Sequence, residues 1–226
     1  MIGCKKGDFY RKLLLKEYLI YQLYAELTEF SFKTQLVSVK LVDINKNWDT
    51  IESIGFIIEN QEEMAAHFEG KCIKPKTLGS SAIDPNHWAF LSLFEYMIGN
   101  TDWAMRNSHN IRFMLTNASD RVIPVAYDFD YSGLVNAPYA VHRESIDLEL
   151  ISTRYFLGPC KIKDQLAQQI PLFLEKKATL YKIVNDFELL SAKDKKKVIN
   201  YLDQFYTVIT TPKYFKQSIL DKCIED

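Results

Sequence analysis

The chain has 226 residues, of which 47% are hydrophobic, and its 28 lysines and arginines nearly balance 29 aspartates and glutamates. This length allows one large domain or two small lobes with a sizeable core. Because the formal net charge is −1, the composition gives no electrostatic reason to expect nucleic acid or an anionic membrane surface as a partner.

The sequence shows no targeting segment and no membrane span. The first residues, MIGCKKGDFYRK, contain no apolar core of signal-peptide length, and no apolar run elsewhere could cross a bilayer. The cysteines are scattered without metal-ligand spacing and are interpreted as reduced thiols, although a paired disulfide is also compatible with the sequence. We therefore expect a cytoplasmic protein without a membrane partner. The four cysteines are Cys4, Cys72, Cys160 and Cys223.

The first sixty residues predict one helix and two strands. Asp8 can cap a helix over about 9–27, and its apolar residues crowd more than one face, so we expect it wedged between other elements. Residues 35–43 alternate between apolar and polar, which is typical of a half-buried strand. A turn at 45–47 leads to a second strand over 52–59, and the two strands are expected to pair antiparallel.

A buried helix is expected after a connecting segment. The connection contains a short helix over 61–68 and a loop over 70–81. Asp84 and Pro85 then predict a helix start, because an N-cap residue is followed by proline at the first helical position. Residues 86–98 are apolar almost all round, which indicates a central helix, and Gly99 ends it.

A polar loop and a short hairpin follow this helix. Residues 111–115 and 122–127 predict two strands joined by a polar turn. If these strands pair antiparallel, Asn110 before the first and Asp128 after the second become neighbours. Amide and carboxylate oxygens, completed by phosphate or water, suit Mg²⁺. Asp102, on the preceding loop, could reach the same point as a proton acceptor.

The second half of the chain predicts mainly helices. An irregular stretch runs from Gly133 to about Pro159, and residues 161–224 indicate three or so amphipathic helices broken near Pro171, Asn185 and Thr211. With strands early and helices late, the order of elements indicates an α+β fold.

The central stretch resembles the catalytic core of the protein-kinase-like superfamily, nearest to atypical bacterial members such as the HipA-type and CotH-type kinases. In that superfamily a buried helix leads into a loop with a catalytic aspartate. An asparagine then begins a short strand, and a hairpin ends in a metal-binding aspartate. Asp102, Asn110 and Asp128 occupy these places, and the order of elements matches over roughly residues 9–133.

The resemblance implies ATP- and magnesium-dependent phosphoryl transfer to an acceptor that the sequence does not identify, a protein or a small molecule. Asp102 would accept the proton of the acceptor hydroxyl, and Asn110 and Asp128 would hold magnesium with help from Asp130. Asn107 is the alternative amide ligand, because kinases usually place the asparagine five residues after the aspartate. His109 is interpreted as a structural residue.

The resemblance also implies a partial small lobe over residues 1–60 and a helical large lobe over 61–226. Glu17 would be the glutamate that pairs with the nucleotide lysine, and Glu59 would lie in the hinge that contacts adenine. No glycine-rich loop and no strand-borne lysine precede the first helix, and Lys5 and Lys6 are poor candidates for holding phosphate. The alternative function is therefore a kinase-like pseudoenzyme or truncated fragment that acts as a protein-binding module.

Two other enzyme classes also use Asp-x-Asp after a strand. Haloacid-dehalogenase-type phosphatases place this motif near the start of an alternating β/α chain, whereas a helical tail follows it here. Metal-dependent glycosyltransferases require several βα units upstream, which this sequence does not predict. A glycosyltransferase function would also leave Asp102 and Asn110 unexplained. Both classes rank below phosphoryl transfer to an acceptor.

Overall fold

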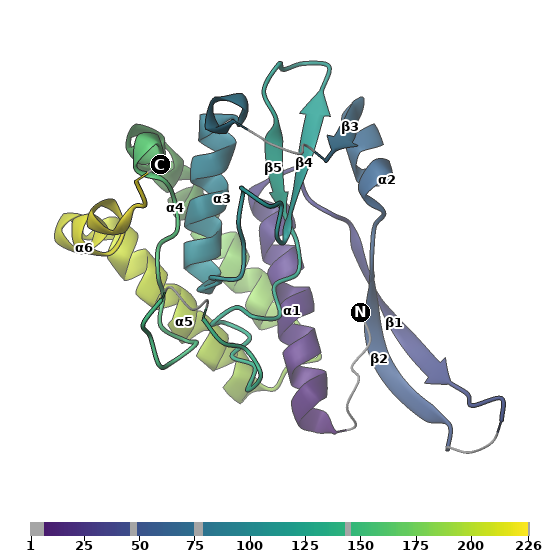
Figure 1. The fold of residues 1–226 in the computed structure, drawn as a ribbon. Coiled ribbons are helices and arrows are strands. Elements are labelled where there is room, and N and C mark those ends of the chain that lie inside the picture. The colour runs from purple at the N-terminus through teal and green to yellow at the C-terminus, as the bar shows by residue number, and fades with distance from the viewer. Residues whose placement is uncertain (1–6, 46–48, 75–78, 143–145, 226) are drawn as a thin grey trace.

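The computed structural model describes residues 7–45, 49–74, 79–142 and 146–225, and these form an α+β fold (Figure 1). Helices α3 to α6 lie on one side of the long helix α1, and the strands lie on the other side. The helices are α1 (Asp8–Leu27), α2 (Gln61–Ala66), α3 (Pro85–Ile98), α4 (Lys163–Asp186), α5 (Ala192–Thr210) and α6 (Pro212–Ser218). The strands are β1 (Thr34–Leu41), β2 (Ile51–Ile58), β3 (Gly70–Ile73), β4 (Ile111–Thr116) and β5 (Ile123–Ala126).

Helix α1 is wedged between the other elements, as its crowded apolar faces predict. Leu15, Leu19 and Leu23 are fully buried along it. The prediction that Asp8 caps this helix is wrong. Gly7 is the N-cap with a φ of 123°, and the Asp8 carboxylate lies inside the first turn.

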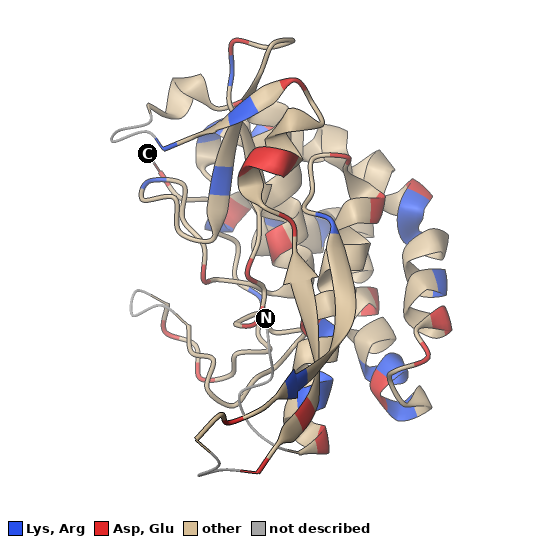
Figure 2. Ribbon diagram, turned by 90° about the vertical axis from the view of Figure 1, so that its right-hand side faces the viewer, with Lys and Arg blue, Asp and Glu red and all other residues tan. Residues whose placement is uncertain are grey.

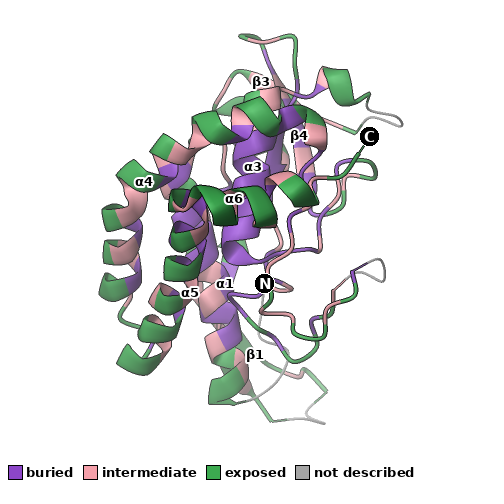
Figure 3. Cartoon of the chain, turned by 90° about the vertical axis from the view of Figure 1, so that its left-hand side faces the viewer, coloured by how far each residue is buried: buried purple, intermediate pink, exposed green. Residues whose placement is uncertain are grey.

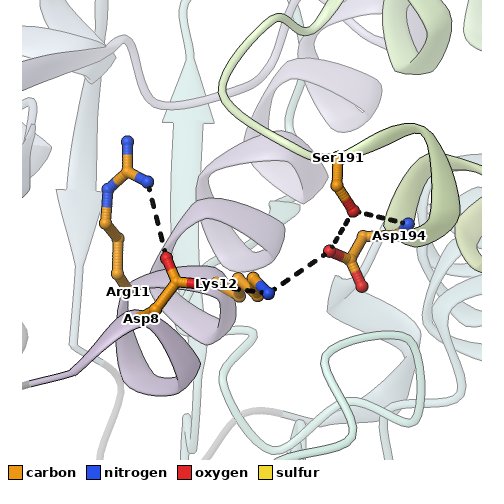
Figure 4. Close-up of polar contacts among 5 residues, drawn as sticks. All are labelled: Asp8, Arg11, Lys12, Ser191 and Asp194. Atoms are coloured by element: carbon orange, nitrogen blue, oxygen red, sulfur yellow. Dashed lines mark hydrogen bonds and ion pairs between the residues drawn. The ribbon is translucent and has the colours of Figure 1, made fainter.

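The start of α1 is joined to the start of α5 by a chain of polar contacts (Figure 4). Lys12 Nζ lies 3.0 Å from Asp8 and 3.8 Å from Asp194. Ser191, the N-cap of α5, accepts the backbone N–H of Asp194 and donates its hydroxyl to the same residue's carboxylate. The capping role predicted for Asp8 is thus replaced by ion pairing with Lys12 and Arg11.

Strands β1 and β2 pair antiparallel, as predicted, from Thr34 opposite Ile58 to Leu41 opposite Ile51. The second sheet has the order β3-β4-β5. Strand β3 corrects the prediction of a loop over 70–81. Gly70 makes this pairing possible, because a Cβ there would lie only 2.7 Å from the carbonyl oxygen of Leu115 on β4.

Helix α3 has the limits and the burial that the sequence predicts. The Asp84 carboxylate accepts the N–H groups of Asn86 and His87, and Pro85 occupies the first turn. Every residue from Trp88 to Ile98 is buried, and α3 runs through the centre of the burial view (Figure 3). Gly99 ends the helix with a left-handed φ of 68°.

The helical tail packs on α3 and α1, and its exposed sides carry charged residues of both signs (Figure 2). The predicted break near Pro171 is wrong, because Pro171 lies inside the 24-residue helix α4. Leu166 and Phe173 on either side of it are fully buried, and this packing stabilises a helix that proline alone would weaken. The breaks near Asn185 and Thr211 are confirmed.

Cys160 and Cys223 form a disulfide, so the prediction of reduced thiols is wrong for this pair. The neighbouring backbone supports the link, because Cys160 N–H donates to Ile224 and Ile224 N–H donates to Gly158. Cys72 is free, and Cys4 lies outside the described residues. The thiol argument for a cytoplasmic location no longer holds, and that location remains a prediction. Within the described residues no helix combines the length and apolarity needed to span a bilayer.

We expect the disulfide to stabilise the fold by about 2–4 kcal/mol, because it closes a long loop in the unfolded chain. Its two cysteines are 63 residues apart in the sequence. Urea unfolding of wild type with and without dithiothreitol, and of the double variant C160S/C223S, measures this contribution. Reductant should lower the wild-type midpoint to that of the double variant and leave the double variant unchanged. The variant C72S should behave as wild type. A wild-type midpoint that is the same with and without dithiothreitol would contradict the expectation.

Candidate active site

The loop between α3 and β4 folds back on itself. Gly99 begins it, and a side chain at this position would overlap the Tyr201 hydroxyl, so the close packing requires glycine. Ala104 and His109 then exchange two backbone hydrogen bonds of 3.0 Å each. This tight turn returns residues 109 and 110 to the vicinity of Asp102.

Asp102 is held at its backbone and at both carboxylate oxygens. Its N–H donates to Asn100 Oδ1 at 2.9 Å, and its Oδ1 lies 2.8 Å from His109 Nε2. Asn110 Nδ2 donates to Asp102 Oδ2 at 3.1 Å and to the Asp102 carbonyl at 2.8 Å. The Asp102 side chain is 31% exposed, so it is oriented by neighbours and still open to a small group from solvent.

Asn110 and Asp128 flank the β4-β5 hairpin, as the sequence predicts. Ile111 lies opposite Ala126, and Tyr127 N–H donates to the Asn110 carbonyl at 3.1 Å. Both Asn110 and Asp128 have left-handed backbones, with φ of 53° and 64°. Such conformations store strain and cluster at functional sites.

Helix α1 fixes the end of β5 through two tyrosines. The Tyr21 hydroxyl accepts the N–H of Asp128 at 2.8 Å, and the Tyr24 hydroxyl accepts the N–H of Ala126 at 3.3 Å. Phe129 is fully buried, and its ring lies 4.7 Å from Tyr21 and 5.8 Å from Phe94 of α3. The backbone that carries Asp128 is therefore anchored to both central helices.

Glu17, Asp128 and Asp130 form an acidic cluster at this point. Burial raises the pKa of Asp128, and the charge of Asp102 raises it further. Burial and the charge of Asp128 raise the pKa of Asp130 to about 6, against hydrogen bonds from Tyr139 and a backbone N–H. Burial, Asp130 and Asp128 together raise the pKa of Glu17 well above its usual range. These carboxyl groups therefore need protons or a cation to offset their repulsion.

Glu17 has an incomplete set of partners. Its side chain is 3% exposed, and Phe129 N–H is the hydrogen-bond donor that opposes its raised pKa. Its Oε1 finds no hydrogen-bond partner among the described residues. The same residues contain no group of three or more His, Cys, Asp or Glu side chains placed to hold a metal ion. A cation here would therefore need the Asn110 amide oxygen and oxygens from outside the protein.

Two residues that the sequence predicts for the site, Glu59 and Asn107, are not among the side chains that meet around Asp102 and Asp128. The Glu59 carboxylate follows β2 and is engaged by Lys33 N–H at 3.1 Å and His67 Nε2 at 2.7 Å. Asn107 is exposed on the 104–109 turn, whereas Asn110 is buried against Asp102. The geometry therefore favours Asn110 as the amide of the site. Lys5 and Lys6 lie outside the described residues.

His109 makes a structural hydrogen bond, in agreement with its interpretation from the sequence, because its Nε2 lies 2.8 Å from Asp102 Oδ1. Sequence reasoning missed two other residues that support the site. Tyr21 lies one helical turn after Glu17, and that spacing was the available signal for a shared face. Arg154 donates to the carbonyls of Tyr96 and Met97 at the end of α3, and no local pattern indicated this role.

The site thus combines a hydrogen-bonded aspartate, a buried asparagine and a half-buried aspartate with raised pKa, supplied by one loop and one hairpin. Helix α1 contributes the glutamate and two tyrosine hydroxyls behind them. The sequence matches no protein-family model and no curated protein.

Proposed function

We propose that the chain is an ATP- and magnesium-dependent phosphotransferase with a protein-kinase-like fold. The observation that carries the proposal is the convergence of Asp102, Asn110 and Asp128. Asn110 joins the other two, because its side chain donates to the Asp102 carboxylate and its carbonyl accepts from the residue before Asp128. Phosphoryl transfer requires mainly positioning and charge stabilisation, which an acid-amide-acid set can supply.

The donor atoms at the site suit magnesium. Asn110 uses its Nδ2 on Asp102, which leaves its Oδ1 for a cation. Burial and the nearby charge of Asp102 raise the pKa of Asp128, so a cation beside this carboxylate would be stabilising. In this proposal Asn110 and Asp128 hold the ion, Asp130 assists, and phosphate or water completes the shell. Magnesium, when bound, neutralises charge on the ATP phosphates.

Asp102 has the position of a proton acceptor. In the proposed reaction an acceptor hydroxyl donates its proton to Asp102 while its oxygen bonds to the γ-phosphorus, and ADP leaves. The hydrogen bonds from Asn110 and His109 orient the carboxylate for this task. Asp102 and His109 are 31% and 46% exposed, which lets an acceptor on a protein or small molecule reach them.

The kinase-like fold remains part of this proposal. Its small lobe would comprise residues 1–60 and its large lobe residues 61–226. Because the Glu59 carboxylate is engaged by Lys33 and His67, the 59–60 hinge would contact adenine through its backbone. The alternative is a kinase-like protein-binding module without transfer. One observation favours this alternative. Glu17 is the glutamate that would pair with the nucleotide lysine of a kinase, and its buried Oε1 has no partner among the described residues.

Thermal unfolding with ATP, with magnesium and with both together tests the nucleotide site. A ligand at one hundred times its dissociation constant adds about 2.7 kcal/mol, so both together should raise the midpoint by roughly 5–10 °C. ATP with a chelator should give no comparable rise. The proposal fails if the combination leaves the midpoint unchanged. A rise without ADP formation over a range of hydroxyl acceptors would favour the binding module.

A further inference from the structure

A buried carboxyl group beneath the candidate site has no role in the proposed reaction. Glu95 lies on α3, four residues before Gly99, and is 0% exposed. Neither of its carboxylate oxygens makes a hydrogen bond within the described residues. Burial raises its pKa to about 8. A group this costly to bury calls for a functional explanation.

The side chain that faces Glu95 is Asn100. The Asn100 amide lies near enough to Glu95 to lower the pKa of that carboxyl group against the effect of burial. Its Nδ2 is buried and, like the Glu95 oxygens, makes no bond of good geometry in the described chain. Other titratable groups near Glu95 are Asp102 on the loop and Tyr24 on α1. An amide donor and a carboxyl acceptor, both unsatisfied and adjacent, are complementary.

The other end of the Asn100 amide holds Asp102. Asn100 Oδ1 accepts the Asp102 N–H at 2.9 Å, and Asn100 N–H donates to the Glu95 carbonyl at 2.8 Å. Because the amide group is planar and rigid, fixing its Nδ2 also fixes its Oδ1. Anything that orients the Asn100 side chain therefore orients the backbone of the proposed proton acceptor.

We infer that Glu95 is a positioning residue, and that it forms with Asn100 a buried carboxyl–amide pair that holds the backbone of Asp102 in place. The expected effect of Glu95 on catalysis rests on the proposed phosphotransfer. The link from Glu95 through Asn100 to the backbone of Asp102 does not. In its neutral form the pair supports the loop without adding a second negative charge beneath Asp102. Ionisation of Glu95 at alkaline pH introduces that charge, but it also tightens the contact with Asn100, because a carboxylate accepts from an amide more strongly than a neutral carboxyl group does.

Hydrogen exchange of the Asp102 amide, measured by NMR on the full chain between pH 6 and 9, tests the link. Wild-type protection, corrected for intrinsic exchange, should rise in one step near pH 8, the pKa of Glu95. The variant E95Q keeps an acceptor for Asn100 and should retain protection without the alkaline step. The variant E95L should lose roughly three- to tenfold of the protection at every pH, as expected for one buried hydrogen bond.

The matched control is S92A, which removes another buried polar group from α3, a hydroxyl that donates to the helix's own Trp88 carbonyl. It should leave Asp102 protection unchanged. Unchanged protection in E95L, or an alkaline step that persists in E95Q, would overturn the inference. If the wild type forms ADP, E95L should lower kcat and leave the KM for ATP unchanged. If it forms none, the proposed function fails, while the exchange data still decide the role of Glu95.

Discussion

Replacing Asp128 by asparagine should abolish the magnesium-dependent thermal shift with ATP, whereas replacing Asp102 by asparagine should preserve it. Asp128 is the half-buried carboxylate proposed to bind the ion, and Asp102 is proposed to act only on the acceptor hydroxyl. Both variants should lower turnover, D102N by roughly 10²- to 10⁴-fold, the usual contribution of a general base. Thermal unfolding and ADP formation on the same preparations separate the two effects.

The two asparagines provide the matched pair for this experiment. N110A should lose the magnesium-dependent shift, because Asn110 lies between Asp102 and Asp128. N107A should behave as wild type, because Asn107 is exposed on the turn. Loss of the shift in N107A with retention in N110A would reverse the assignment of the amide. Retention of the full shift in D128N would remove the proposed metal site from the hairpin.

The stability of the wild-type chain should fall as the pH rises from about 5 to 9. The Glu95 pKa is raised from 4.5 to about 8 in the folded state. Between these values the folded chain holds a proton that the unfolded chain has released, so raising the pH favours unfolding. The slope for one group approaches 1.4 kcal/mol per pH unit, and the total for Glu95 is on the order of 5 kcal/mol. Glu17, with its pKa also raised, contributes with the same sign.

Urea unfolding at successive pH values measures this slope. E95Q should remove much of this dependence of the unfolding free energy on pH, because an amide does not titrate over this range. E52Q removes a carboxyl that is 74% exposed on β2 and should keep the wild-type slope. A wild type whose unfolding free energy rises from pH 5 to 9 would contradict the expectation, as would an E95Q slope equal to that of the wild type.

Local sequence signals were sufficient to predict an element where a particular residue type fixes the backbone conformation at its ends. Asp84, Pro85 and Gly99 set the limits of α3, and the polar turn between two apolar runs set the β4-β5 hairpin. The hairpin in turn brings Asn110 to Asp128, so the proposed metal pair was predictable from strand pairing alone. Its chemical role is a separate question that strand pairing does not address.

The features that the sequence did not reveal depend on distant parts of the chain. Strand β3 is four residues long, and it pairs because β4 offers an edge and Gly70 permits close approach. The Cys160–Cys223 link joins residues far apart, and spacing does not determine connectivity. The Tyr21 hydroxyl meets Asp128 across 107 positions of the chain. Helix α4 continues through Pro171 because tertiary packing outweighs local propensity.

The two tyrosine hydroxyls of α1 have a consequence for regulation. Because they hold the N–H groups of Asp128 and Ala126, a displacement of α1 relative to β5 must break those bonds or move the end of the strand. A binding event that favours one placement of α1 would therefore change the affinity of the proposed magnesium ion at Asp128. Thermodynamic reciprocity requires that this ligand change the affinity of the remote binder by the same factor. Helix α1 is thus the element through which a distant contact would exert allosteric control over the site.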